Sequence, residues 1–576
     1  MNWLVRRIVD GYRALAKKVY ARRYGPLVQQ VVPPQAKTSK RGFIIIQIDG
    51  LSYDHLVQAI ARGTTPHLKR LIGAGRSRLA SWRCGFPSTT PVIQAGIMFG
   101  HNWDVPGFRW YDKAQRRALV CKRPSTVQAL QKRIAAGRRG ILRGGASYYN
   151  MFDGEAERAI FTLSTLRAPH FFESVRGLGP AVLFLLSPLR VLRVIRLALW
   201  NYVLDVGRRL MAVFRPSVYR PFDLLSPMTR IFTQVLFQEI ITFGVQMDIY
   251  RGTPSIYVNI TTFDEVAHHV GPTHPAAFQA LKDIDRQVAR IDNMLTRYRR
   301  HDYDLYILSD HGMSPSTPFK WRFGLSLGDY ILQQIGEPLI LDERWGSPAH
   351  ALTQARYLLQ ELHGLEERSS PRSATVVRAA REYLDQHLPG AHPDEQVANG
   401  NHNHWDPERH SDISVRVSGP LAHVYFNVSE QRLNLSEVAL IYPVLLNRLI
   451  EHPGIGAVVG REGDETVMTS RQGTLTIHGE RERLRGDHPL TGLSDLPYQV
   501  AQIDYVASFP HSGDLMLLGA WDGVEVVTFE DQIGTHGGVG GPQEKPFVLY
   551  PGETEWPGDA IKDSRDLYAV FARYLG

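Results

Sequence analysis

Three short apolar runs, far apart in the chain, each lead into an aspartate. The runs and their aspartates are residues 43–48 with Asp49, residues 255–260 with Asp264, and residues 304–309 with Asp310. Short continuous apolar runs are typical of parallel strands that are buried on both faces. Open α/β sheets bind their ligands at the edge formed by the carboxyl ends of such strands. The chain is therefore predicted to fold as an α/β protein that brings acidic side chains to one edge of its sheet.

Histidines stand close to two of these aspartates. Asp264 and His268 are four residues apart, so both point to the same side of a helical turn if one forms here. His311 directly follows Asp310, and His536 lies in a glycine-rich turn near the C-terminus. Taken singly, each is more often a capping or loop residue, but carboxylates mixed with imidazoles suit zinc or manganese. Six such side chains are more than one ion needs, which predicts two metal ions. The candidate ligands are Asp49, Asp264, His268, Asp310, His311 and His536.

Thr90 is the candidate nucleophile. Pro91 favours the start of a helix, which places Thr90 at the N-cap. A hydroxyl there faces free backbone N–H groups and the positive end of the helix dipole, where a phosphate binds well. Such a threonine ordinarily only caps its helix, but two metal ions about 4 Å apart would activate the hydroxyl and clamp a phosphoryl group. Ser88 and Thr89 are weaker candidates for the same role.

Positive charge is concentrated in two segments. Residues 1–41 carry ten Lys or Arg and one acidic residue, which equals the net charge of +9 for the whole chain. Within them, residues 2–23 show apolar residues at helical spacing and Trp3, a pattern that suits an anionic membrane surface. Residues 178–215 combine an uncharged apolar stretch with arginines and predict a second membrane contact. The alternatives are a helix packed on the protein body and a buried hairpin.

Other partners and compartments are constrained by the same features. The basic residues lie on apolar helices without interleaved aromatic platforms, so nucleic acid is not the expected partner. There is no secretory apolar region, and the two cysteines, Cys84 and Cys121, suit a reducing compartment. The expectation is a cytoplasmic protein held peripherally at a membrane.

The remaining segments are less informative. A long helix is predicted over 275–299, a strand over 424–428, a helix over 436–450, and strands over 515–518 and 524–527. The rest of 314–500 shows helical pattern and loops. His402 and His404 lack an acid-bearing strand end and are interpreted as loop residues.

Five short motifs occur in an order that resembles the alkaline phosphatase superfamily, and within it the type I phosphodiesterase/nucleotide pyrophosphatase family. The motifs are Asp49-Gly50, residues 87–91, Asp264-x-x-x-His268-x-x-Gly271-Pro272, residues 309–313 and Thr535-His536-Gly537. The resemblance covers about residues 43–311 and 510–550. It implies a doubly wound, mostly parallel sheet and a site with two zinc ions.

The resemblance also implies residue roles. Asp264, His268 and His536 would hold one metal, while Asp49, Asp310 and His311 would hold the other. Thr90 would act as the nucleophile and form a phospho-threonine intermediate that water hydrolyses.

The chain departs from the family after the nucleophile helix. Pro106-Gly107 stands where the family has a His-Gly pair, and the family's phosphate-binding Asn falls near Trp110 or Tyr111. Asn102 or Tyr111 is the candidate substitute for that substrate contact.

These observations predict residues 1–41 as a basic segment and linker, followed by a catalytic domain over 42–576. Insertions are expected at about 113–250, where the chain contacts a membrane, and at about 320–505, where it forms a cap. The predicted function is a metal-dependent phosphodiesterase or phosphatase acting on a lipid-linked or nucleotide phosphate. A phosphoryl or headgroup transferase or mutase of the same superfamily, and a non-catalytic membrane-associated scaffold, are the alternatives.

Overall fold

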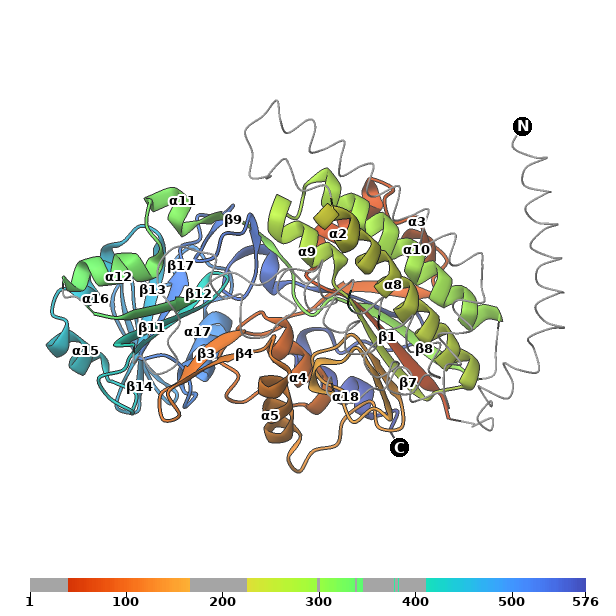
Figure 1. Cartoon of the computed structure of the whole chain (residues 1–576), viewed down its shortest axis with the longest axis horizontal. Helices are drawn as coiled ribbons and strands as arrows, with labels where there is room; N and C mark the ends of the chain where they lie inside the picture. Colours follow the sequence, from red (N-terminus) through yellow and green to blue (C-terminus); the bar gives the residue numbers. More distant parts are fainter. Residues whose placement is uncertain are drawn as a thin grey trace.

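The computed structural model in Figure 1 describes residues 40–165, 225–297, 301–336, 339–344 and 411–575, together with positions 378 and 382. The predicted N-terminal helix over 2–23 lies outside the described residues. The same holds for the apolar and basic segment 178–215 and for His402 and His404.

A seven-stranded sheet forms the centre of the larger half of the molecule, in the order β2-β20-β8-β1-β7-β5-β6. Strand β1 lies between β7 and β8 and runs parallel to both, and β5 runs parallel to β7 and β6. Strand β20 is antiparallel to both of its neighbours, β2 and β8. The bounds are β1 Gly42–Ile48, β2 Ser77–Ser81, β5 Ala146–Tyr148, β6 Arg158–Ile160, β7 Ser255–Ile260, β8 Tyr303–Leu308 and β20 Phe547–Pro551. The prediction of buried parallel strands before Asp49, Asp264 and Asp310 is confirmed.

Helices cover both faces of this sheet (Figure 1). On one side lie α2 (Tyr53–Ala61), α3 (Pro66–Gly73), α8 (Leu225–Arg251), α9 (Thr262–Val270) and α10 (Pro275–Arg297). On the other lie α4 (Thr90–Phe99), α5 (Pro124–Ala135) and α18 (Leu567–Ala572). Every residue of β1 is buried, because a strand covered on both faces needs apolar side chains on both. The doubly wound α/β fold predicted from the sequence is confirmed.

A second sheet of eight strands lies beside the first, in the order β10-β11-β12-β17-β13-β14-β15-β16. Its neighbouring strands are antiparallel except for β10 and β11. The bounds are β10 Leu341–Arg344, β11 Ile413–Ser418, β12 Leu421–Phe426, β13 Ile455–Glu462, β14 Glu465–Thr469, β15 Gly473–His478, β16 Arg481–Gly486 and β17 Leu515–Gly519. The sequence prediction had anticipated only β12 and β17 among these strands.

Both faces of the second sheet are also covered. Helices α12 (Leu327–Ile335), α15 (Leu435–Ile441) and α16 (Leu445–Glu451) share one apolar core with it. Helix α17 (Leu496–Ala507) shares a separate core with the alternate residues of the same strands. The predicted helix over 436–450 is therefore two short helices.

Smaller elements connect the two sheets. A three-stranded sheet has the order β18-β9-β19, with β9 at Ser314–Pro318, β18 at Val526–Thr528 and β19 at Gly534–Thr535. The hairpin of β3 (Arg109–Asp112) and β4 (Arg117–Val120) approaches the second sheet, where Ser418 Oγ accepts a bond of 3.0 Å from the backbone N–H of Phe108. Among the described helices, none is long and apolar enough to cross a bilayer.

Candidate metal centre

One group of three candidate ligands lies at the carboxyl edge of the central sheet. Asp49 follows β1, and Asp310 and His311 follow the neighbouring parallel strand β8. All three are at most 3% exposed. His311 Nε2 lies 3.6 Å from Asp49 Oδ1 and 3.4 Å from Asp310 Oδ2. The structure therefore brings together residues that are about 260 positions apart in the sequence, because their strands are adjacent.

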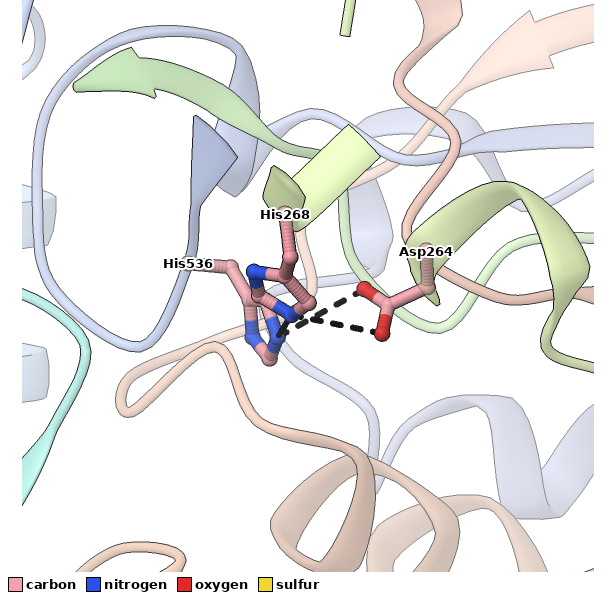
Figure 2. Close-up of side chains that lie close together, drawn as sticks. All are labelled: Asp264, His268 and His536. Carbon is pink, nitrogen blue, oxygen red and sulfur yellow. Dashed lines mark hydrogen bonds and ion pairs between the residues drawn. The ribbon is translucent and has the colours of Figure 1, made fainter. Parts of the chain in front are cut away.

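A second group of three contains the remaining candidates (Figure 2). Asp264 and His268 lie one turn apart on α9, and His536 directly follows β19. His268 Nε2 is 3.3 Å from Asp264 Oδ2 and 3.2 Å from His536 Nε2, and His536 Nε2 is 3.6 Å from Asp264 Oδ1. The two groups adjoin, since the rings of His311 and His536 stack with centroids 3.7 Å apart.

Thr90 lies at the first group. Its Oγ1 is 3.3 Å from His311 Nε2 and 3.5 Å from Asp49 Oδ1. The N-cap of α4 is Thr89, so the predicted cap position of Thr90 is wrong by one residue. Thr90 is the first helical residue and Pro91 the second. Proline is tolerated at the second position as well as the first, because backbone N–H groups in the first turn have no helical partner.

The separations match tetrahedral coordination. Zinc bonds of about 2.0 to 2.1 Å place tetrahedral ligands about 3.3 Å apart. The separations given above, within both groups and to Thr90 Oγ1, lie between 3.2 and 3.6 Å. Buried oxygens of two aspartates, Asp264 Oδ1 and Asp310 Oδ2, also lack a hydrogen-bond partner among the described residues. Such atoms are costly to bury unless an ion satisfies them, so the residues fit a pair of divalent ions.

The three histidines are oriented in the same way. Each Nδ1 lies 2.8 to 2.9 Å from a backbone carbonyl oxygen, which must accept its proton. The partners are Gly534 for His268, Gly312 for His311 and Ser88 for His536. These bonds fix the tautomer and leave each Nε2 lone pair directed at its group, as is usual for histidines that bind a metal.

Burial and mutual charge set the protonation of the first group. Burial, together with the neighbouring Asp310 and Asp264 carboxylates, raises the pKa of Asp49 well above its usual value. Burial and Asp264 likewise raise the pKa of Asp310 to about 7. Burial lowers the pKa of His311 to about 4, so its imidazole is neutral at pH 7. Carboxyl groups crowded in this way are stabilised as anions only when a cation joins them.

The second group has a different balance of charge. Burial opposes ionisation of both members of the Asp264 and His268 pair, yet their attraction lowers the pKa of Asp264 and raises the pKa of His268. Burial and the nearby His311 lower the pKa of His536 to about 3. The attraction between Asp264 and His268 thus favours their charged forms, while the low pKa of His536 keeps its imidazole neutral at pH 7.

The hydroxyls of the two weaker nucleophile candidates, Ser88 and Thr89, have no recorded contact with a candidate ligand among the described residues. Ser88 Oγ donates to the carbonyl of Gly538 at 3.3 Å and accepts from the N–H of Gly537 at 2.9 Å. Thr89 Oγ1 is buried and makes no capping bond to α4. Only Thr90 among the three has a hydroxyl with a recorded contact to a candidate ligand.

The two candidate substrate-binding residues, Asn102 and Tyr111, contact residues other than the six candidate ligands. Asn102 Oδ1 accepts a bond of 3.2 Å from the Tyr505 hydroxyl. Tyr111 packs against Tyr425 and under the Arg416 guanidinium. Within the described part of the chain, neither residue has a recorded contact with the six candidate ligands.

Other residues at the site were missed from the sequence. Asn259 Nδ2 donates to Asp49 Oδ2 at 2.8 Å. Lys122 is half-buried just after the β3–β4 hairpin. Burial and the nearby Arg109 lower its pKa to about 7, and three carboxylates, Glu530, Glu265 and Asp264, oppose that shift. No motif surrounds Asn259 or Lys122, and only the strand pairing and the hairpin bring them to the site.

A doubly wound sheet that carries two such ligand groups beside a hydroxyl is the framework of a metal-dependent hydrolase. The chain belongs to the type I phosphodiesterase/nucleotide pyrophosphatase family, whose profile matches residues 43–431. It is thus a phosphoester hydrolase, and this family depends on metal ions.

Several solved structures are similar to this chain at low identity. Phosphonoacetate hydrolase from Sinorhizobium meliloti, in complex with phosphonoformate, is 14% identical, with a TM-score of 0.46 over 93% of this chain and 96% of that one. Murine ectonucleotide pyrophosphatase/phosphodiesterase 5, an inactive form in complex with AMP, is 11% identical, with a TM-score of 0.42 over 93% and 95% of the two chains. The comparison with curated proteins gave no match.

Proposed function

We propose that the protein hydrolyses phosphoesters through a covalent phospho-threonine on Thr90, with two zinc ions held by the two ligand groups. Manganese is the alternative metal, since it accepts the same oxygen and imidazole ligands. The observation that carries the proposal is the position of Thr90 Oγ1, 3.3 Å from His311 Nε2 and 3.5 Å from Asp49 Oδ1. At that distance the hydroxyl completes the first group as its fourth member.

The residues divide the work as follows. Asp49, Asp310 and His311 would hold one ion, and Asp264, His268 and His536 the other. When bound, the two ions supply positive charge that lowers the pKa of the threonine hydroxyl and stabilises charge on the phosphoryl oxygens.

The chain's own part in the reaction is nucleophilic. Thr90 Oγ1 bonds to phosphorus while the bond from phosphorus to the leaving oxygen breaks. The hydroxyl proton passes through solvent to that oxygen, so the leaving group departs as an alcohol or phosphate. Water then attacks the phospho-threonine, breaks the bond between Oγ1 and phosphorus, and regenerates the hydroxyl. The N-terminal end of α4 directs its free N–H groups at the phosphate during both steps.

The substrate we propose is a lipid-linked or nucleotide phosphate met at the cytoplasmic face of a membrane. Support comes from the sequence alone, because residues 2–23 and 178–215 combine basic with apolar residues. Flotation of the full chain with phosphatidylserine vesicles tests this location. Binding that is lost at high salt or on phosphatidylcholine vesicles supports it, and equal binding to both vesicles overturns the electrostatic basis.

The chemistry is tested with bis-p-nitrophenyl phosphate and p-nitrophenyl phosphate in the presence of zinc or manganese. We expect activity that EDTA abolishes and that Thr90→Ala reduces by about a thousandfold or more. Mass spectrometry of acid-quenched wild-type enzyme should find phosphate on Thr90. Thr89→Ala is the matched control, because its hydroxyl makes no capping bond and has no recorded contact with a candidate ligand.

Three outcomes contradict parts of the proposal. Activity that survives both EDTA and Thr90→Ala overturns it. Transfer of the phosphoryl group to an added alcohol in preference to water assigns the protein to the transferases. Absence of stoichiometric metal together with absence of turnover on mono- and diesters indicates a non-catalytic scaffold.

A further inference from the structure

Polar side chains lie in the buried centre of the main sheet, directly behind the first ligand group. Gln47 on β1, Asn259 on β7 and Gln94 on α4 are each at most 3% exposed. The neighbouring positions of β1 are isoleucines. Burying an amide costs free energy unless it is hydrogen-bonded, so amides in such a core need a reason to be there.

Strand register places Asn259 against Asp49. Asn259 pairs with Gln47 across the parallel strands, and Asp49 lies two residues further along on the same face of the sheet. Asn259 Nδ2 donates to Asp49 Oδ2 at 2.8 Å. The other carboxylate oxygen, Asp49 Oδ1, is thereby left facing His311 and Thr90.

Asn259 makes no other recorded bond with its side chain. Its Oδ1 is buried without a hydrogen-bond partner among the described residues. An amide that served only to fill the sheet would be expected to satisfy both of its ends. The bond to Asp49 is therefore the feature that accounts for asparagine at this position.

Gln94 connects the nucleophile helix to the same strand. It lies four residues after Thr90 on α4, one turn further along the same side of the helix. Its Nε2 donates to Gln47 Oε1 at 3.0 Å, and its Oε1 accepts from the N–H of Met151 at 2.8 Å. These bonds fix the position of α4 relative to β1.

Gln47 is oriented by its neighbours. Its Oε1 also accepts a bond of 2.6 Å from the Tyr257 hydroxyl, so both of its recorded donors bind the oxygen. The amide nitrogen is thereby turned toward Asp49 Oδ2, at 3.5 Å. The chain of contacts runs from the helix of Thr90, through Gln94 and Gln47, to the carboxylate of Asp49.

We propose that Asn259, Gln47 and Gln94 are positioning residues, which hold Asp49 in the orientation that binds a metal and hold Thr90 at a fixed place beside it. This rests on the function proposed above. Asn259 acts mainly on the metal, because it orients a ligand directly. Gln94 acts mainly on the nucleophile, because it fixes the helix that carries Thr90.

Bound zinc is the first readout and does not depend on activity. Full-length protein is dialysed against a zinc buffer with fixed free zinc, and the metal is counted by mass spectrometry. We expect two ions in the wild type and one in Asn259→Leu, the same count as in His311→Ala, because outer contacts of this kind change metal affinity by about 10- to 100-fold. Raising free zinc by that factor restores the second ion and the activity of Asn259→Leu.

Gln94→Leu has a different expected result. It retains two zinc ions but loses about tenfold or more in kcat with little change in KM, because the nucleophile is displaced while the ligands remain. Asn427→Leu is the matched control, since Asn427 also donates through Nδ2, has an unpartnered Oδ1 among the described residues, and directly follows β12 of the second sheet. It should retain two zinc ions and normal kcat.

The outcomes separate this inference from the proposed function. Two tightly bound ions in Asn259→Leu, or equal losses of zinc and thermal stability in Asn259→Leu and Asn427→Leu, overturn the positioning role. Normal kcat in Gln94→Leu overturns the link to Thr90. A wild type that never binds two ions, or an active Thr90→Ala, instead overturns the proposed function.

Discussion

Metal binding at the first ligand group should be coupled to proton release, and lowering the pH from 8 to 6 tests this. Burial and Asp264 raise the pKa of Asp310 to about 7, and burial and Asp310 raise the pKa of Asp49 well above its usual value. A metal binds only the ionised carboxylates. The imidazole of His311 does not compete, because burial has already lowered its pKa to about 4.

The magnitude follows from Asp310. A carboxyl with a pKa of about 7 is ionised in about one tenth of molecules at pH 6 and in about nine tenths at pH 8. The apparent affinity should therefore fall by about tenfold, or about 1.4 kcal/mol, over these two pH units. Asp49 changes in the same direction and makes the loss larger.

The assay is a zinc titration of metal-free protein at pH 6, 7 and 8, against a chelator whose own protonation is corrected for. Calorimetry at pH 7 in two buffers with different ionisation enthalpies counts the protons released. Affinity that changes by less than twofold between pH 6 and 8, or binding that releases no protons, would refute the reasoning.

Three further perturbations test the surroundings of the site. Burial raises the pKa of Glu544 to about 7, so ionisation of this carboxyl destabilises the fold as pH rises from about 4.5 to 7. The free energy of unfolding of Glu544→Gln should exceed that of the wild type by up to about 3 kcal/mol at pH 8 and by little at pH 4, which is measured as a higher Tm at pH 8 alone. Gly419 has φ of +66°, and a Cβ there would overlap the carbonyl oxygen of His536. Gly463 has a similar φ of +55° but open space around it, so Gly463→Ala carries the same backbone strain without the overlap. Zinc content should therefore fall in Gly419→Ala and stay unchanged in Gly463→Ala. Lys122→Met should raise KM for phosphodiesters at unchanged zinc content, and an unchanged KM would exclude Lys122 from anion binding.

Much of the central fold could be predicted from the sequence. The apolar runs before Asp49 and Asp310 become strands β1 and β8, because continuous hydrophobicity over six or seven residues is what a strand buried on both faces requires. The helix predicted over 275–299 is α10, Pro275–Arg297, whose amphipathic period is regular. The ends of helices were predicted less exactly, since α4 begins at Thr90 and not at Pro91 as the sequence predicts.

The second sheet could not be predicted in the same way. Strand β16 is exposed along its whole length, so no apolar alternation marks it, and β15 alternates over only Leu475 and Ile477. Their pairing in hairpins stabilises them instead. The substrate candidates Asn102 and Tyr111 stay predictions, and their positions depend on loops and on the β3–β4 hairpin.

The sequence by itself determined the six candidate ligands and the candidate nucleophile Thr90, since these residues stand in short motifs, and the family resemblance of those motifs implied the division of the ligands into two groups. It also determined the α/β class, because hydrophobic period depends only on local sequence. The tertiary structure alone decided that Thr90 Oγ1 lies 3.3 Å from His311 Nε2, and that Asn259 and Gln94 stand behind the site. Those contacts join segments from separate strands and helices, and their geometry arises only when the elements pack together.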